Sequence, residues 1–339
     1  MKAVVFAGNG MLDLQELPDP RPEGPDDVVI RVAANGICGS DLRALTTPPQ
    51  MVYDEGVVIG HEFVGEVSAV GSEVTGVAVG QRVTAVPNIN CQVCWYCRSG
   101  HLNLCESFVH LGSMRNGGAA DYVVVPERMI VPVPDSLSDE MATLAEPLAC
   151  VLNGTRAAGV HPGETVLILG AGPIGLLYQM IFKAAGAQVI VSEPGEHRAE
   201  LAAELGADAV IDPRRQDPAE AAREATGGRG ADVSIDCVGM LLTDSIAAVR
   251  KGGKVLVFGL NEEARAEIPV ADIAYREVHV HGVYIGKGTF PLAVELLDRN
   301  EIGFERLLTH RFELGQAMDA VNAARAGEAV KALLVPAAA

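Results

Sequence analysis

Four cysteines lie within fifteen residues of the chain, and their spacing indicates a metal site. They follow the pattern C-x2-C-x2-C-x7-C and are Cys91, Cys94, Cys97 and Cys105. Two-residue gaps allow consecutive thiolates to curl around one cation, and the longer excursion brings back the fourth. Because four thiolates complete a tetrahedral zinc shell without an open position, we predict a structural zinc site in a lobe of about residues 88–106.

A second set of possible metal ligands is dispersed and mixes sulfur, nitrogen and oxygen donors. Cys38 lies in a tight turn after a predicted strand, and His61 and Glu62 follow a glycine. Glu146 lies much further along, just before the composition of the chain changes. Three such ligands and one replaceable position are typical of catalytic zinc. From spacing alone, these four residues form either that site or separate core and surface groups.

A glycine-rich turn, Gly170-Ala-Gly-Pro-Ile-Gly175, separates a strand-length apolar run at 165–169 from a predicted helix over 176–185. Such a turn lets backbone N–H groups and a helix N-terminus approach a pyrophosphate. A second apolar run ends at Glu193, where an acid can accept hydrogen bonds from the adenosine ribose. We therefore predict a dinucleotide site rather than an ordinary turn. The charge of Glu193 favours NAD over NADP, because it would repel a 2′-phosphate.

The totals of the chain exclude several classes of protein. A length of 339 residues favours two domains, and 49% hydrophobic residues with 21% charged residues exclude general disorder. The net charge of −18 argues against nucleic acid and anionic membranes as partners. The most apolar region, 165–191, divides into strand, turn, helix and strand, so it does not indicate a membrane span. Clustered cysteines without an export signal indicate a cytoplasmic protein.

The pattern of predicted elements changes near residue 150. Residues 1–150 contain short Val-rich strands separated by Gly and Pro, which is typical of a compact antiparallel barrel-like domain. Residues 151–285 alternate strands with Ala-rich helices, which predicts a doubly wound parallel sheet. The strands of this second part are predicted at 165–169, 188–192, 209–211, 231–236, 254–259 and 278–284.

Residues 286–339 are assigned back to the first domain. They predict an amphipathic helix over 290–299, another around 314–325, a last strand near 333–335 and a frayed end at 336–339. Elsewhere, Ser138 is the predicted N-cap of a helix. Helix C-caps are expected at Gly206, Gly252 and Gly253.

Together these motifs resemble the zinc-containing medium-chain alcohol dehydrogenases over nearly the whole chain. The resemblance implies a GroES-like catalytic domain, residues 1–150 and 286–339, split around a Rossmann NAD-binding domain, residues 151–285. It also implies Cys38, His61 and Glu62 as ligands of a catalytic zinc, with Glu146 either a ligand or bound through the zinc water. The matching motifs are Cys38-Gly-Ser-Asp41, Gly60-His-Glu62, the four-cysteine lobe, Gly118 with Tyr122, Ala145-Glu-Pro147 and the glycine-rich turn.

Within that family, the polyol branch, similar to sorbitol dehydrogenases, fits the sequence best. Liver-type enzymes commonly have a cysteine where Glu146 stands, and Leu111–Asn116 is similar to idonate and sugar-acid dehydrogenases. The implied reaction transfers a hydride from a secondary alcohol of a polyol, sugar or sugar acid to NAD and gives the ketone. Sorbitol dehydrogenases often show an Arg-Tyr pair where Ile285 and Gly286 stand here, which argues against sorbitol itself.

The resemblance also assigns a proton relay. Ser40, two residues after Cys38, would pass the alcohol proton toward the nicotinamide ribose. Arg43 stands where many relatives have the histidine that completes this relay, and arginine cannot act as a shuttling base. Water or another group would then take that role.

Further implications concern the cofactor and the assembly. Bacterial-type relatives with this lobe are commonly homotetramers.

Two other functions remain open: an L-threonine 3-dehydrogenase, although those enzymes often have Asp-Pro instead of Glu146-Pro147, and a noncatalytic NAD-binding protein. Lys287 and Arg115 either meet an anionic substrate group or are surface charges. The implied cofactor contacts are Gly170, Gly172, Pro173, Ile174, Gly175, Glu193, Arg198, Gly239, Phe258, Gly259, Leu260, Val283 and Tyr284.

Overall fold

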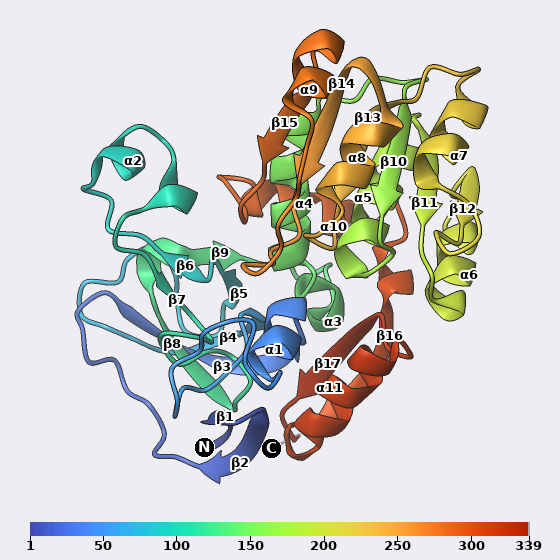
Figure 1. Ribbon diagram of the computed structural model, residues 1–339. Coiled ribbons are helices and arrows are strands. Elements are labelled where there is room, and N and C mark those ends of the chain that lie inside the picture. Colours follow the sequence, from blue (N-terminus) through green and yellow to red (C-terminus); the bar gives the residue numbers. More distant parts are fainter. Residues whose placement is uncertain (338–339) are drawn as a thin grey trace. The chain divides into compact units, whose positions relative to one another are not determined.

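The computed structural model describes residues 1–337, which form two compact units (Figure 1). Unit 1 contains Met1–Ala149 and the chain from Gly286 onward, and unit 2 contains Cys150–Ile285. Part of the predicted frayed end, residues 338–339, lies outside the described residues. Among the residues that are described, no helix combines the length and the apolar character that a membrane crossing needs.

Unit 1 is built on a seven-stranded sheet in the order β16-β17-β3-β4-β5-β9, with β8 paired to β3. Neighbouring strands are antiparallel except for the parallel pair β16 and β17. The central strand β3 is buried along most of its length because it pairs with three other strands. The bounds are β3 Asp27–Gly36, β4 Glu62–Val70, β5 Arg82–Ala85, β8 Tyr122–Pro126, β9 Ile130–Pro132, β16 Leu308–Glu313 and β17 Lys331–Val335.

Smaller elements complete unit 1. Two short antiparallel ribbons join β1 (Lys2–Gly8) to β2 (Met11–Glu16) and β6 (Asn88–Ile89) to β7 (Val109–His110). The Ser138 hydroxyl accepts a hydrogen bond from the Met141 N–H (3.3 Å), so Ser138 is the N-cap of α3. The helices are α1 Gly39–Ala44, α2 Trp95–Arg98, α3 Asp139–Ala142, α10 Phe290–Arg299 and α11 Ala317–Ala326; the 3-10 turns are η1 Leu102–Leu104, η2 Glu127–Met129, η3 Phe304–Leu307 and η4 Leu314–Gln316.

Unit 2 is a six-stranded parallel sheet in the order β12-β11-β10-β13-β14-β15. The chain starts at β10, moves outward to β12 and returns to β13 on the other side of β10, as a doubly wound sheet requires. Every residue of β10 is buried, which is expected when helices cover both faces of a parallel sheet. The strands are β10 Thr165–Leu169, β11 Gln188–Ser192, β12 Ala209–Ile211, β13 Ala231–Asp236, β14 Val249–Val257 and β15 His279–Gly282.

The helices of unit 2 follow its strands, and α4 (Ala145–Ala158) leads into them. Gly206 has a φ of +89° directly after α6, so the predicted C-cap is present there. The same prediction is wrong for Gly252 and Gly253, which lie in β14. Helix α8 already ends at Ala248, and the next residue is extended. The remaining bounds are α5 Pro173–Ala184, α6 Glu196–Glu204, α7 Pro218–Ala225, α8 Leu242–Ala248 and α9 Val270–Arg276.

Candidate active site

The four cysteines of the lobe converge in unit 1. Their sulfur atoms all lie within 4.8 Å of one another, and all four thiols are free of disulfides. Backbone N–H groups point at the sulfurs: the Cys94 N–H lies 3.3 Å from Cys91 Sγ, and the Cys97 N–H lies 3.5 Å from Cys94 Sγ. Hydrogen bonds from the Val93 and Cys94 N–H groups lower the pKa of Cys91 to about 6. This set of thiolate donors fits zinc.

A second cluster brings together Cys38, His61 and Glu62, whose possible ligand atoms also lie within 4.8 Å of one another. Cys38 follows the end of β3 and precedes α1, whereas Glu62 is the first residue of β4. The antiparallel pairing of Gly36 with Glu62 places these two strand ends side by side. A Cβ atom at Gly36 would overlap Glu62 Oε2, so only glycine leaves room for this carboxylate.

The charge around His61 is strongly negative. Burial alone lowers the pKa of His61, but the Cys38 thiolate, Asp41 and Glu146 outweigh it and raise this pKa to about 10. The Nδ1 atom of His61 is buried without a hydrogen-bond partner. Glu146, in the first turn of α4, lies within electrostatic reach although it is not part of the three-residue cluster. Sulfur, nitrogen and oxygen donors surrounded by acids fit a divalent zinc ion.

A hydroxyl network borders this cluster. The Tyr53 hydroxyl donates to Asp41 Oδ1 (2.8 Å), and its oxygen lies within hydrogen-bond distance of Ser40 Oγ (3.2 Å). Ser40 Oγ lies 3.5 Å from His61 Nε2, and Asp41 Oδ2 accepts the Cys38 N–H at 2.9 Å. Burial raises the pKa of both Asp41 and Tyr53. Ser40 therefore lies between a metal-ligand candidate and a buried tyrosine, where a hydroxyl can pass on a proton.

The nucleotide candidates gather at one edge of the parallel sheet in unit 2. The glycine-rich turn follows β10, and Gly170 has a φ of +97°. Glu193 follows β11, where its carboxylate accepts the N–H groups of Ala171 (2.7 Å) and Gly195 (2.8 Å). The acid is thus held against the turn itself. The remaining candidates follow β13, β14 and β15, apart from Arg198, which lies within α6.

Two of these turns pack backbone against backbone. A Cβ atom at Gly239 would lie 2.5 Å from the Gly259 carbonyl oxygen, so both positions require glycine. The buried Asp236 carboxylate, at the end of β13, accepts the N–H groups of Val238, Gly239 and Leu241 at 2.7–2.9 Å. These bonds fix the backbone of the turn after β13 at the carboxyl edge, where doubly wound sheets bind ligands.

Comparison with known proteins identifies the family of the chain. Residues 24–135 match the alcohol dehydrogenase GroES-like domain, and residues 173–299 match the zinc-binding dehydrogenase domain. The chain is 38% identical to L-idonate 5-dehydrogenase of Vitis vinifera, covering 91% of this chain and 88% of the relative. It is 34% identical to sorbitol dehydrogenase of Bacillus subtilis (strain 168), covering 99% and 97%.

A solved structure extends this likeness to the whole fold. A zinc-binding dehydrogenase from Sinorhizobium meliloti 1021, bound to NADP, superposes with a TM-score of 0.93 at 36% identity over 99% of both chains. The chain belongs to the zinc-containing medium-chain alcohol dehydrogenases. It is a dehydrogenase of their polyol branch, a zinc-dependent oxidoreductase of CH–OH groups with a GroES-like domain and a Rossmann-type sheet.

Sequence reasoning missed several residues of this dehydrogenase. Asp41 closes the Cys38 motif but was not selected, and Tyr53 lies in a stretch without any pattern. The His110 ring lies 4.8 Å from the His61 ring, and burial, followed by the charge of His61, lowers the pKa of His110 to about 3. Lys331 lies far along the chain and still contacts Glu62. Only Asp41 had a local signal, since it stands three residues after Cys38.

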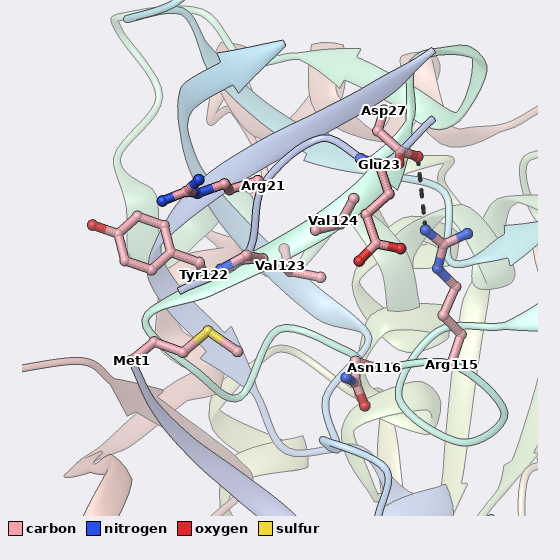
Figure 2. A pocket seen from close by; sticks show the side chains of 10 residues that line it. Met1, Arg21, Glu23, Asp27, Arg115, Asn116, Tyr122, Val123 and Val124 are labelled. Carbon is pink, nitrogen blue, oxygen red and sulfur yellow. Dashed lines mark hydrogen bonds and ion pairs between the residues drawn. The ribbon is translucent and has the colours of Figure 1, made fainter. Parts of the chain in front are cut away.

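Arg115 and Lys287, the two side chains that could meet an anionic substrate group, lie in different surroundings. Arg115 lines a surface pocket of unit 1 with its guanidinium 3.8 Å from Asp27 (Figure 2). The same aspartate accepts the N–H groups of Glu23 (3.1 Å) and Gly24 (2.7 Å), so it is firmly held. This pairing favours the surface-charge interpretation of Arg115. Lys287 is half-buried just after the start of the returning segment of unit 1.

Two glycines of the glycine-rich turn have different roles: Gly175 allows close packing of the helix, and Gly172 leaves room for the cofactor. A Cβ atom at Gly175 would overlap the Gly170 carbonyl, whereas one at Gly172 would meet nothing within 4 Å. We expect Gly175→Ala to lower Tm by about 5 °C or more, because helix α5 must move away from β10. Gly172→Ala should leave Tm unchanged and weaken NAD binding about tenfold, because the methyl group blocks the approach of pyrophosphate. Thermal melts and NAD titrations check both, and equal melts for the two variants would contradict the assignment.

Proposed function

We propose that this dehydrogenase oxidises a secondary hydroxyl group of a polyol or sugar acid with NAD, at a zinc held by Cys38, His61 and Glu62, with Glu146 either a ligand or bound through the zinc water. The observation that carries this proposal is the convergence of Cys38, His61 and Glu62 into one cluster. A zinc ion bound there supplies Lewis-acid polarisation of the substrate hydroxyl group. A bound nicotinamide would supply the acceptor for the hydride of the carbinol carbon. Residues 1–150 and 286–339 act as the catalytic domain, and 151–285 bind NAD.

Ser40 is the residue that first receives the substrate proton in this proposal. Its hydroxyl lies 3.5 Å from His61 Nε2 and 3.2 Å from the Tyr53 hydroxyl, so it is held beside the metal-ligand candidates. Arg43, in the last turn of α1, carries a permanent charge and cannot accept the proton. The proton would therefore leave Ser40 toward water or toward the ribose of a bound nicotinamide.

The preference for NAD is supported by Glu193. Its carboxylate is fixed against the glycine-rich turn by two backbone N–H groups, so its charge stands beside the adenosine site. A nearby guanidinium, Arg214, donates to the Pro194 carbonyl (2.7 Å), but the Asp212 carboxylate pairs with it at 2.8 Å and offsets its charge. The S. meliloti structure contains NADP, whereas in this chain the fixed charge of Glu193 favours NAD.

Changing Glu193 tests this preference directly. We expect Glu193→Ala to raise kcat/KM with NADP relative to NAD on the order of tenfold, because a charge that repels the 2′-phosphate is lost. Glu193→Gln removes the same charge and keeps an acceptor oxygen for the Ala171 N–H, so it should retain more of the activity with NAD. Steady-state kinetics with both cofactors measure the ratio. An unchanged ratio in both variants would show that Glu193 does not select the cofactor.

The assembly and location form part of the same proposal. We place the enzyme in the cytoplasm as a homotetramer, in keeping with its clustered free cysteines. Strand β15 is at the edge of its sheet, and apolar side chains near it are exposed, among them Val270, Tyr275 and Val280. Such features support association between copies. Light scattering of the purified protein measures the mass of the assembly.

Metal determination combined with a substrate screen tests the proposed function. The screen covers polyols, aldonates and L-threonine, followed through the absorbance of reduced nicotinamide. Two zinc ions per chain and turnover of a polyol or aldonate are the expected results. Turnover of L-threonine alone would replace the substrate class. NAD binding without turnover of any secondary alcohol would favour a noncatalytic protein.

A further inference from the structure

A buried tyrosine from a segment without regular secondary structure lies beside Ser40. Tyr53 lies between α1 and β4, and only 7% of it is exposed. Its ring packs edge-on against Phe6 of β1, with the ring centroids 5.9 Å apart. The next residue, Asp54, donates its N–H to the Ser113 carbonyl (2.8 Å). The ring packing and this backbone hydrogen bond together fix the place of the Tyr53 hydroxyl.

The Tyr53 hydroxyl has two polar neighbours and a single proton. Its oxygen lies 2.8 Å from Asp41 Oδ1 and 3.2 Å from Ser40 Oγ. A carboxylate is a stronger acceptor than a hydroxyl group, so the Tyr53 proton is donated to Asp41. The lone pairs of the Tyr53 oxygen are then left to accept the Ser40 O–H. Ser40 is therefore the donor in its contact with Tyr53.

The direction of this hydrogen bond decides what Ser40 offers to a substrate. Because its own proton is held by Tyr53, the Ser40 oxygen keeps its lone pairs for another partner. The same oxygen lies 3.5 Å from His61 Nε2, beside the metal-ligand candidates. A hydroxyl group that rotated freely would often present its proton there instead, and could not then accept a second one.

We propose that Tyr53 is a positioning residue that orients the Ser40 hydroxyl so that its lone pairs meet the substrate proton. The inference rests on the proposed function, in which Ser40 receives that proton. Ser40 takes one proton from the substrate and gives one up toward water or toward the ribose of a bound nicotinamide, so it ends as a neutral hydroxyl again. Tyr53 keeps its own proton throughout, because a phenol is protonated at neutral pH.

Tyr53→Phe tests this role, because it removes the hydroxyl and keeps the ring that packs on Phe6. We expect kcat for the polyol or aldonate that the wild type turns over to fall about tenfold, with KM for it within about twofold of the wild type. Ser40→Ala should lower kcat about a hundredfold. Adding Tyr53→Phe to Ser40→Ala should change kcat by no more than about twofold, because the hydroxyl that Tyr53 orients is gone.

Crystal structures test the same arrangement without turnover. In the wild type, Ser40 Oγ should lie within hydrogen-bond distance of the Tyr53 oxygen. In Tyr53→Phe, the Ser40 side chain should occupy more than one rotamer, while the zinc content stays that of the wild type. The wild-type structure alone tests the contact if Tyr53→Phe does not fold.

Tyr178 provides a matched control for this substitution. It is fully buried in α5 of unit 2, and its hydroxyl has no hydrogen-bond partner among the residues that the structure describes. Tyr178→Phe therefore removes a buried hydroxyl without removing a hydrogen bond, and it should leave kcat and KM unchanged. An equal loss of kcat in Tyr178→Phe and Tyr53→Phe would assign the effect to general loss of buried hydroxyls and contradict the inference.

Three further results would overturn the inference. These are a wild-type kcat in Tyr53→Phe, a loss of kcat from Tyr53→Phe that persists in Ser40→Ala, or a wild-type Ser40 side chain that is turned away from Tyr53. The second result would mean that Tyr53 acts through Asp41 or through the fold. Failure of the proposed function is distinct, because the wild type would then turn over no secondary alcohol, whereas the crystal structures would still show whether Tyr53 orients Ser40.

Discussion

Cys38→Ser is expected to remove one of the two zinc ions per chain and to lower kcat about a thousandfold. A serine hydroxyl is not ionised at neutral pH and is a poor zinc ligand, whereas a thiolate binds zinc directly. Loss of Lewis-acid polarisation raises the barrier by several kcal/mol, and about 4 kcal/mol corresponds to a thousandfold. Metal content by mass spectrometry and initial rates of NAD reduction measure both effects.

A cysteine outside both clusters provides the control for this variant. Cys150 is buried in α4 and belongs to neither group of ligands, so Cys150→Ser should retain both zinc ions and most of the activity. The four-cysteine lobe should keep its zinc in both variants. Full metal content and turnover in Cys38→Ser would mean that the cluster with His61 and Glu62 is not catalytic.

The two metal sites differ in how far the sequence could predict them. The lobe is local: two-residue gaps allow each N–H to point at the preceding sulfur, as the Cys94 N–H does toward Cys91 Sγ. Its convergence was therefore predictable from spacing. The gap from Cys38 to His61 carries no such geometry, and only the family resemblance joined them. What joins them physically is the pairing of Gly36 with Glu62, which is a property of the whole sheet.

Long-range partners had no signal in the sequence. Lys331 is 269 residues from Glu62 and lies just before the strand predicted near 333–335, where a lysine is usually exposed. Tyr53 reaches Asp41 and Ser40 from a segment without regular structure. Parallel strands with a strict apolar pattern, such as 165–169, were predicted at their observed bounds because both faces are buried. The apolar pattern of the sequence predicts where strands begin and end, but it does not predict which polar side chains contact one another.

Cys97→Ser is expected to reduce the zinc content from two ions to one and to lower Tm by about 10 °C. The lobe exposes much of its apolar surface, with Val93 at 64% and Trp95 at 70%, so it has little core of its own. Cys97 itself is buried, and burial raises the pKa of its thiol to about 12 when no metal is present. Zinc binding in small domains contributes on the order of 10 kcal/mol, and loss of even a third of that explains the shift in Tm.

The site of the first proteolytic cut distinguishes loss of the lobe zinc from general destabilisation of the protein. Limited proteolysis of Cys97→Ser should cut within residues 91–105 first, because this segment is held mainly by its metal. Ser99→Ala removes an exposed hydroxyl that bonds the Trp95 carbonyl (2.8 Å) in the same lobe and should change neither zinc content nor Tm. Two zinc ions and a wild-type Tm in Cys97→Ser would contradict a structural metal. Loss of zinc with an intact lobe would show instead that the N–H bonds to sulfur suffice to hold this segment.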